Sequence, residues 1–253
     1  MIEAIQLTKR YADTLVVDEV SLRIAAGGMT VIIGPNGAGK STLLGMISRL
    51  LPMSSGKARV DGMDVRHSDT TELAKRLAIL KQDNHVALRL TVRELVAFGR
   101  FPHSRGRLSA EDQRHIDDAI RYLGLEALQE RFLDQLSGGQ RQRAFVAMVL
   151  CQQTDYVLLD EPLNGLDMRH AVAMMETLRQ ACDELGKTVV MVLHDINFAS
   201  CYADTIVAMR DGKVVQHGPP AELITAPMLT DLYGTPVTVH NIDGQRICVY
   251  YSA

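Results

Sequence analysis

The sequence predicts an α/β fold in which a mixed central sheet carries an N-terminal antiparallel β subdomain and an inserted α-helical subdomain. The first observation is the alternation of apolar and polar residues in Ile5–Thr8 and Val20–Ile24, as in half-buried antiparallel strands. The second is a pair of almost continuously apolar runs, Tyr156–Leu159 and Val189–Leu193, typical of central parallel strands buried on both faces. The third is the helical character of Thr91–Gln153, which lies between these two groups of strands.

The chain is long enough for a full hydrophobic core, either as one large α/β domain or as a domain with an attached subdomain, and we expect a single domain over residues 1–253. Its α/β core and the antiparallel β subdomain are expected from residues 1–82 and 156–225. The helical subdomain is expected over residues 83–155, and a short C-terminal extension over residues 226–253.

The remaining elements follow from local signals. Further strands are expected at short apolar or alternating runs, namely Met29–Ile33, Gly56–Gly62 and Ala78–Leu80. Two hairpins are expected after them. One joins Ile206–Met209 to Val214–His217 at Asp211-Gly212, and the other joins two strands within Pro236–Tyr251 at Asp243-Gly244. Helices are expected after capping residues or a strand: Ser41–Leu50, a helix opened by a capping box at Ser109–Asp112 and running to Leu123, Gln140–Gln153 headed by Ser137, and Met168–Leu185 capped by Asp167.

The composition limits the classes of function. A net charge of −3 gives no general affinity for nucleic acid or anionic lipid. The four cysteines are widely separated, which favours buried or inert thiols in a reducing compartment: Cys151, Cys182, Cys201 and Cys248. The N-terminus has no signal-peptide pattern, and the longest apolar runs are too short to cross a membrane. We therefore expect a cytosolic protein that could still dock on a membrane protein.

One stretch fits the phosphate-binding pattern G-x-x-x-x-G-K-[ST]. Its residues are Gly34, Pro35, Asn36, Gly37, Ala38, Gly39, Lys40, Ser41 and Thr42. The glycines let backbone N–H groups close around phosphate oxygens, and the N-terminus of the following helix favours an anion. Lys40 is placed to reach the β- and γ-phosphates, and the Ser41 hydroxyl to ligate Mg²⁺. The alternative is a glycine-rich turn without a ligand.

Two apolar strands end in residues that suit nucleotide chemistry. Asp160 is a candidate Mg²⁺ ligand, and Glu161 a candidate general base for an attacking water. His194, at the end of the other strand, is a candidate hydrogen-bond donor beside the γ-phosphate. The alternatives are a strand-end acid that only caps a helix, and a structural histidine.

A second glycine-containing run is Ser137, Gly138, Gly139 and Gln140, followed by Arg141-Gln142-Arg143. A capping box explains Ser137 and Gln140 but not two adjacent glycines, each of which costs about 1 kcal/mol relative to alanine in a helix. Paired glycines suit close approach of the backbone to an anion.

This run resembles the signature of ABC-type ATPases, and the resemblance extends to the order of motifs over residues 1 to about 225. Gln82 falls at the position of the family's Q-loop glutamine, Asn164–Asp167 at the D-loop, and His194 at the switch histidine. Tyr11 matches the aromatic residue that stacks on adenine, although a tyrosine at a strand end also packs in many cores. The fold implied is the phosphate-loop NTPase fold of ABC type.

The resemblance implies ATP and Mg²⁺ as cofactors and a second copy of the chain as partner. In such a head-to-tail dimer, the signature residues Ser137 to Gln140 contact the ATP held by the partner's phosphate loop. Gln82 links the γ-phosphate and Mg²⁺ to the helical subdomain, and Asp167 crosses the interface besides capping its helix. Hydrolysis of ATP then reopens the dimer.

The stretches Gly99–His103 and Leu163–His170 resemble those of the ATPases of iron-chelate and vitamin B12 importers. This implies a peripheral subunit on the cytoplasmic face of the membrane, with permease subunits as partners and a substrate-binding protein as an indirect one. Residues of about 83–105 would form the groove for a permease helix. Arg100 and His103 could instead lie on a solvated loop.

The alternatives to a siderophore are vitamin B12, haem or a divalent metal as cargo, and a soluble ABC ATPase without a transport role. The last usually has tandem domains or a coiled-coil insertion, which this sequence lacks, and no nucleic-acid partner is expected. The signature excludes a small-molecule kinase. Lys81 stands where the family often has proline, and Gly165 where it often has serine or a bulkier residue; neither changes a catalytic group.

Overall fold

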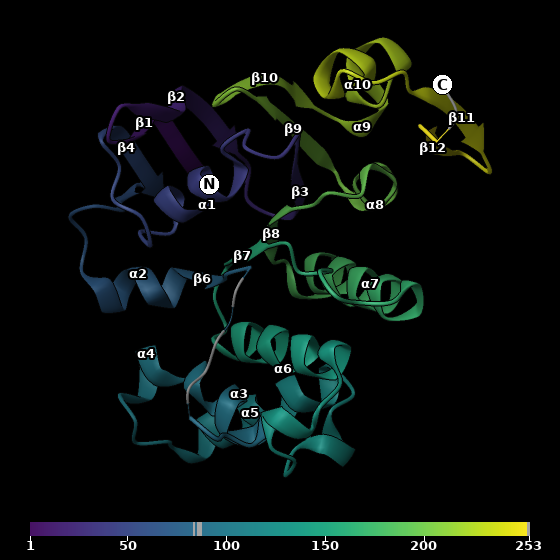
Figure 1. Cartoon of the computed structure of the whole chain (residues 1–253). Helices are drawn as coiled ribbons and strands as arrows, with labels where there is room; N and C mark the ends of the chain where they lie inside the picture. The colour runs from purple at the N-terminus through teal and green to yellow at the C-terminus, as the bar shows by residue number, and fades with distance from the viewer. Residues whose placement is uncertain (83, 85–87, 252–253) are drawn as a thin grey trace. The chain divides into compact units, whose positions relative to one another are not determined.

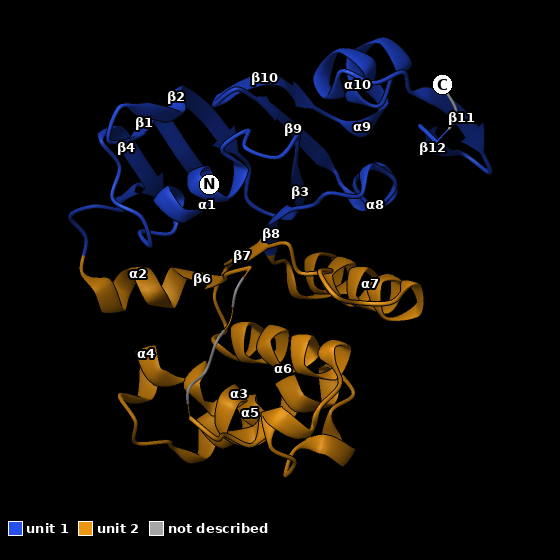
Figure 2. Ribbon diagram, viewed as in Figure 1, with its two compact units in different colours: residues 1–68, 188–253 blue, residues 69–187 orange. Residues whose placement is uncertain are grey.

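The computed structural model of the chain describes residues 1–82, 84 and 88–251 (Figure 1). The chain divides into two compact units, residues 1–68 with 188–253 and residues 69–187 (Figure 2). We call them unit 1 and unit 2 and describe each by itself. The subdomain boundaries expected near residues 82, 155 and 225 stay predictions.

Unit 1 begins with an antiparallel sheet of four strands in the order β2-β1-β4-β5. The strands are β1 (Ile2–Tyr11), β2 (Thr14–Ile24), β4 (Ser55–Val60) and β5 (Met63–Asp64). Alternate residues of β2 between Val20 and Ile24 are buried, so the prediction of half-buried antiparallel strands here is confirmed.

The second sheet of unit 1 contains mostly parallel strands. β3 (Gly28–Ile33) pairs in parallel with β8 (Thr188–Val192) and with β9 (Thr205–Arg210), and β10 (Lys213–Gly218) pairs with β9 as the predicted hairpin. Every residue of β8 and all but the first residue of β3 are buried, as the continuous apolar runs predict. The two helices that follow these strands are α1 (Lys40–Ile47) and α8 (Ile196–Tyr202).

The C-terminal segment of unit 1 contains α9 (Pro220–Leu223), α10 (Ala226–Tyr233), β11 (Thr238–Ile242) and β12 (Gln245–Val249). The predicted terminal hairpin is confirmed, and Asp243 and Gly244 have φ of 51° and 80°, as a two-residue turn of this kind requires. Helices α8, α9 and α10 were not predicted from the sequence, because they have only four to eight residues and show little periodicity.

Unit 2 is mainly helical, with two parallel strands, β6 (Leu77–Leu80) and β7 (Tyr156–Asp160). Its helices are α2 (Thr70–Arg76), α3 (Val92–Phe98), α4 (Phe101–Ser104), α5 (Ala110–Tyr122), α6 (Gly138–Cys151) and α7 (Met168–Leu185), with short 3₁₀ turns at Glu126–Leu128 and Leu133–Gln135. Helices α3, α5 and α6 pack on one another. Capping boxes at Thr91, Ser109 and Ser137 fix where these three helices begin.

Several predicted helix boundaries were wrong. Helix α1 ends at Ile47 rather than Leu50, since Arg49 adopts a left-handed conformation with φ of 66°. Helix α6 begins at Gly138, directly after its cap, and ends at Cys151. Helices α2 and α4, which are again very short, were not predicted from the sequence.

Arg100 does not lie on a solvated loop. Its guanidinium is buried, with Nε donating to Asp112 Oδ1 at 2.8 Å and Nη1 donating to the Cys151 carbonyl at 3.0 Å. Hydrogen bonds from the Ser109 backbone, and then from Arg100, lower the pKa of Asp112 to about 2. Arg100 therefore holds α5 against the end of α6. His103 is exposed but lies in α4 rather than on a loop, and its Nε2 is 3.0 Å from the Gln152 carbonyl oxygen.

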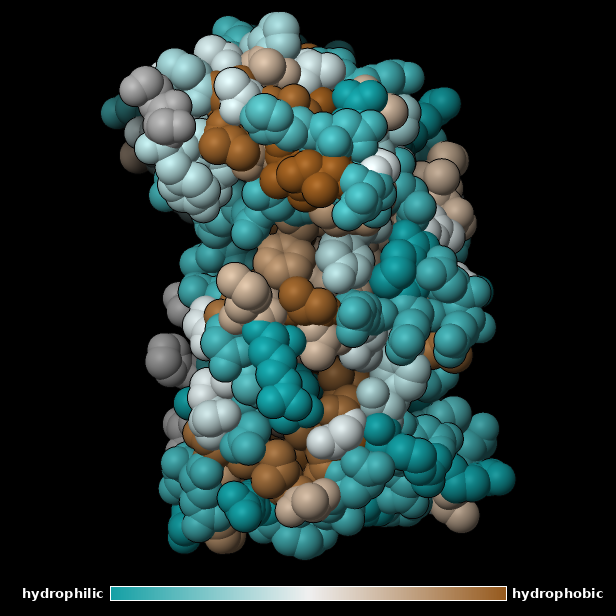
Figure 3. Space-filling model, turned by 90° about the vertical axis from the view of Figure 1, so that its right-hand side faces the viewer, coloured by the Kyte–Doolittle hydropathy of each residue, from teal (hydrophilic) through white to brown (hydrophobic). Residues whose placement is uncertain are grey.

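The four cysteines are free, and all except the partly exposed Cys201 are buried. Burial raises the pKa of Cys151 to about 12 and that of Cys248 to about 11, so both thiols stay protonated at neutral pH. The face shown in Figure 3 is mostly hydrophilic, with small groups of apolar residues. No helix among the described residues has the length and apolar character needed to span a membrane.

Candidate functional site

The phosphate-loop pattern lies between β3 and α1 in unit 1, where glycine is required for steric reasons. Gly37 and Gly39 have φ of 81° and 92°, which side-chain-bearing residues rarely adopt. A Cβ on Gly39 would lie 2.6 Å from the Val16 carbonyl oxygen, and a Cβ on Gly34 would overlap the Met209 carbonyl oxygen. The loop is thus packed on neighbouring backbone, and no bulkier residue fits at these two positions.

Lys40 is the first residue of α1 and is 5% exposed. Its Nζ donates to the carbonyl oxygens of Gly34 and Pro35, at 2.8 and 2.9 Å, which holds the ammonium group across the loop. Asn36, Gly37 and Ser41 are exposed at the same loop. A helix N-terminus, an ammonium group and a cradle without side chains together fit a phosphate group.

His194 leaves the sheet of unit 1 at the same edge as the phosphate loop. Ile32 of β3 pairs with Val192 of β8 in parallel register, and Gly34 and His194 each lie two residues beyond this pair. His194 is exposed, and Asp195 caps α8 directly after it. A strand-end position of this kind is where α/β proteins place ligand-binding residues.

Tyr11 is the last residue of β1 and is 47% exposed, so the alternative that it packs in the core is wrong. The Lys9 Nζ lies 4.8 Å from the centroid of its ring. The exposed ring is compatible with stacking on a base, and that role stays a prediction.

In unit 2 the structure brings Gln82 and Glu161 together. The Gln82 Nε2 donates to Glu161 Oε2 at 2.7 Å. Leu80 of β6 pairs with Leu159 of β7, and Gln82 and Glu161 each lie two residues beyond this pair. This bond was not predicted from the sequence, although the equal offsets of the two residues from parallel strands were a signal that could have revealed it.

Glu161 has a strained backbone, and Asp160 beside it is buried. The φ of Glu161 is 51°, a left-handed conformation that costs a non-glycine residue about 1–3 kcal/mol and persists where its surroundings impose it. The Asn164 N–H donates to the Glu161 carbonyl oxygen at 3.2 Å, and Gln142 of α6 donates to the Pro162 carbonyl oxygen at 3.0 Å. Gln142 was not among the predicted site residues, yet it supports the turn that presents Glu161.

The signature run forms the cap and first turn of α6. The Ser137 Oγ accepts from the Gln140 N–H at 3.3 Å, and the Gln140 Oε1 accepts from the Ser137 N–H at 3.0 Å, so the predicted capping box is confirmed. Ser137 and Gly138 are exposed. The N-terminus of this helix is therefore accessible to an anion.

The predicted D-loop lies against the signature glycines within unit 2. A Cβ on Gly139 would lie 3.3 Å from Leu166 and 3.6 Å from the ring of His170. Asp167 caps α7 as predicted, accepting from the His170 N–H at 2.9 Å and contacting His170 Nδ1 at 2.7 Å, and these bonds lower its pKa. Gly165 stands where the family often has a larger residue. Its φ of 73° is a backbone conformation that favours glycine.

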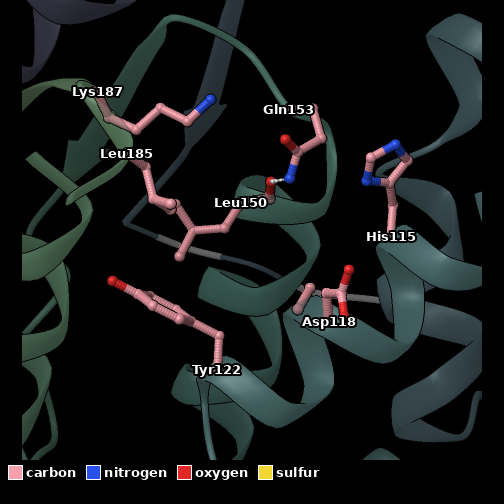
Figure 4. Close-up of a pocket in the computed structure, with 8 residues that line it drawn as sticks. His115, Asp118, Tyr122, Leu150, Gln153, Leu185 and Lys187 are labelled. Atoms are coloured by element: carbon pink, nitrogen blue, oxygen red, sulfur yellow. Dashed lines mark hydrogen bonds between the residues drawn. The ribbon is translucent and has the colours of Figure 1, made fainter.

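A separate pocket of about 460 Å³ in unit 2 contains none of the predicted site residues. Figure 4 shows Tyr122 and Lys187 on one side of it and His115 and Asp118 on the other. The Tyr122 hydroxyl donates to the Thr177 carbonyl oxygen at 3.2 Å, and the Lys187 Nζ to the Thr154 carbonyl oxygen at 2.8 Å. Both polar groups have partners in the protein, so this pocket is not assigned a role.

Comparison with known sequences gives a consistent picture. A family model described as ABC transporter matches residues 17–164. The chain is 52% identical over 252 residues to the petrobactin import ATP-binding protein YclP of Bacillus subtilis (strain 168), covering all of both chains. It is 42% identical over 231 residues to the ferric enterobactin transport ATP-binding protein FepC of Escherichia coli (strain K12), covering 90% of this chain and 85% of that protein.

Two solved structures of ABC proteins are also similar to this chain. The cbiO1 protein from Clostridium perfringens, part of the ABC transporter complex cbiONQ, is 30% identical with a TM-score of 0.78, covering 91% of this chain and 92% of that one. A dimeric post-hydrolysis state of the ATP-binding cassette MJ0796, bound to ADP and Pi, is 31% identical with a TM-score of 0.78, covering 87% of this chain and 99% of that one.

Proposed function

Because this chain belongs to the ABC transporter family of ATP-binding proteins, we propose that it hydrolyses ATP to power import of an iron–siderophore complex through a membrane permease. The main support for this class of cargo is the 52% identity to a petrobactin import protein over the full length of both chains. Relatives named for ferric enterobactin and iron(3+)-hydroxamate are 42% and 39% identical. The different chelates in these names support iron–siderophore import as a class more strongly than any one compound.

ATP is assigned to the phosphate loop, Gly34 to Thr42, with Tyr11 stacking on the base. Lys40 and the backbone N–H groups of the loop would bind the phosphates. Ser41, Gln82 and Asp160 are the proposed Mg²⁺ ligands, and their hydroxyl, amide and carboxylate oxygens suit this cation. When bound, Mg²⁺ would neutralise charge on the phosphate oxygens.

Glu161 is the proposed general base, which takes the proton of the attacking water. Gln82 fixes the direction of its carboxylate through the 2.7 Å hydrogen bond. His194 is the proposed donor that keeps the water in place. The strained backbone of Glu161 supports a functional role, since such strain is concentrated at active sites.

The proposed partner in ATP binding is a second copy of the chain. Ser137 to Gln140 and Asp167 would meet the nucleotide of that copy, and the exposed N-terminus of α6 suits this role. The dimeric state of the MJ0796 cassette supports it. A closed two-fold dimer would contain two equivalent sites.

The proposed contact with the permease is a groove of about 340 Å³ on α3 and α4. Phe98 and Phe101 are 50% and 59% exposed there, with Leu90 and Leu108 beside them. Exposed aromatic residues in a groove suit the apolar side of a helix. The sequence predicts this groove at residues of about 83–105, of which residues 83 and 85–87 lie outside the described residues. This contact would place the chain on the cytoplasmic face of the membrane, with a substrate-binding protein as an indirect partner.

Uptake of radioactive iron tests the cargo. A strain deleted for this chain is expected to lose uptake of one ferric siderophore and to recover it on complementation with the wild-type gene but not with a Glu161→Gln variant. Uptake of vitamin B12, haem and a divalent metal is measured in the same strains. Loss of one of these instead, with intact ferric-siderophore uptake, would replace the proposed cargo while leaving the ATPase in place.

A further inference from the structure

The hydroxyl of Tyr233, at the end of α10, is buried without a hydrogen-bond partner of ordinary geometry. Within the described part of the chain, only one other buried side-chain polar atom, Arg143 Nε, lacks such a partner. An unpaired hydroxyl in the interior costs about 1–3 kcal/mol, and phenylalanine would avoid this cost. The presence of a tyrosine here therefore requires an explanation.

The group that faces this hydroxyl belongs to the phosphate loop. Burial, the largest cause, raises the pKa of Tyr233, and the backbone N–H of Gly34 acts on the phenol oxygen in the opposite direction. Gly34 is the first residue of the loop, and its backbone also lies directly against Met209 of β9. Gly34, where the loop begins, thus lies against β9 and beside the hydroxyl of Tyr233, and all of these belong to unit 1.

Helix α10 is anchored well enough to hold Tyr233 in place. Arg210 of β9 donates from Nη1 to the Asp231 carbonyl oxygen at 2.7 Å and to its carboxylate at 2.9 Å. Leu229 and Leu232 on the same helix are buried. The helix ends at Gly234 in a left-handed conformation, directly after Tyr233.

The rest of the C-terminal segment is bonded to the helix that follows His194 (Figure 1). Asn197 of α8 accepts from the Cys248 N–H at 2.7 Å and donates to the Cys248 carbonyl oxygen at 3.3 Å. Ser200 donates to the Arg246 carbonyl oxygen at 2.7 Å. One segment therefore contacts the chain next to both predicted nucleotide elements of unit 1, Gly34 and His194.

We propose that residues 226–249 brace the nucleotide elements of unit 1 and that Tyr233 is a positioning residue for the phosphate loop. Its hydroxyl accepts from the Gly34 N–H when nucleotide draws the loop into its bound conformation. Hydrogen bonds at active sites are often poorly aligned without ligand and tighten when it binds. The proposal rests on ATP binding at this loop and is independent of the transported cargo.

The test is Tyr233→Phe, which removes one oxygen atom. Loss of one net hydrogen bond in the bound state predicts a Kd for ADP, by calorimetry, that is about 2- to 12-fold weaker. The KM for ATP rises by the same factor and kcat stays within about two-fold. Because the lost hydroxyl is unpaired without nucleotide, Tm is unchanged or higher.

Tyr122→Phe is the matched control. Its hydroxyl has a partner, the Thr177 carbonyl oxygen, and belongs to unit 2. This variant is expected to lower Tm and to leave the Kd for ADP unchanged. Tyr233→Phe is thus expected to weaken the Kd for ADP without lowering Tm, and Tyr122→Phe to lower Tm without changing the Kd. A general packing effect would not separate the two properties in this way.

Two results would overturn the proposal. A wild-type Kd for ADP in Tyr233→Phe would show that the hydroxyl is inert, and a Kd that weakens only together with a lower Tm would show a structural role. Failure of the wild-type chain itself to bind ADP or ATP would instead contradict the proposed function.

Discussion

The phosphate loop of unit 1 and the carboxylate and signature segments of unit 2 are built in different ways. In unit 1 the phosphate loop is one contiguous stretch whose backbone geometry forms the cradle, with glycines packed on the carbonyl oxygens of Val16 and Met209. In unit 2 the candidate site consists of side chains from distant segments, such as Gln82 and Glu161, which are 79 residues apart. The first depends on conformation and the second on pairing between residues.

This difference predicts different consequences of substitution. A loop of close-packed backbone does not tolerate an added Cβ where a glycine lies against a neighbouring carbonyl oxygen. A site built from paired side chains keeps its fold when one partner is changed but loses the geometry of the chemical step. Variants in each unit can therefore separate nucleotide binding from hydrolysis.

The largest effect is expected for Glu161→Gln. Loss of the general base should lower kcat about 10²- to 10⁴-fold while ATP binding persists, so that an ATP-bound dimer accumulates. A malachite-green phosphate assay gives kcat, and size-exclusion chromatography with ATP gives the dimer. The control is Glu176→Gln, an exposed residue of α7 in the same unit, which should behave as wild type. Undiminished hydrolysis by Glu161→Gln would remove Glu161 from this role.

The same contrast explains how much could be predicted from the sequence. The phosphate loop, the caps at Ser137 and Asp167 and the buried strands are local patterns, and the structure confirms the turn, the caps and the strands. Each depends on residues close together in the chain. Local steric and hydrogen-bonding rules are sufficient for such features.

Contacts between distant segments were missed for the opposite reason. The Gln82–Glu161 bond depends on the register of β6 and β7, and the closeness of Gly139 to His170 depends on where the first turns of α6 and α7 lie in the fold. Arg100 appeared free for a partner protein, but it is paired with Asp112 twelve residues later. Of these pairs, only Gln82 and Glu161 left a signal in the sequence, which is their equal offset from two parallel strands.

The next largest effect is expected for Gly39→Ala in unit 1. The added Cβ would lie 2.6 Å from the Val16 carbonyl oxygen at a φ of 92°. Strain of about 1–3 kcal/mol predicts a Kd for ADP that is about 5- to 150-fold weaker by calorimetry. Gly37→Ala is the control, because its φ is 81° but nothing lies within 4 Å of the added Cβ. Equal losses for the two variants would show that close packing adds nothing to conformation at this loop.

The smallest effect is expected for Gln82→Ala. Loss of the bond that directs the Glu161 carboxylate, worth about 1 kcal/mol, predicts a kcat about five-fold lower with the Kd for ADP unchanged. The Mg²⁺ concentration that gives half-maximal activity separates the two roles given to this residue. It stays constant if Gln82 only directs Glu161, and it rises if Gln82 is also a Mg²⁺ ligand. A wild-type kcat would show that the turn supported by Gln142 is sufficient to present Glu161, because the strained backbone would then fix the carboxylate without help from β6.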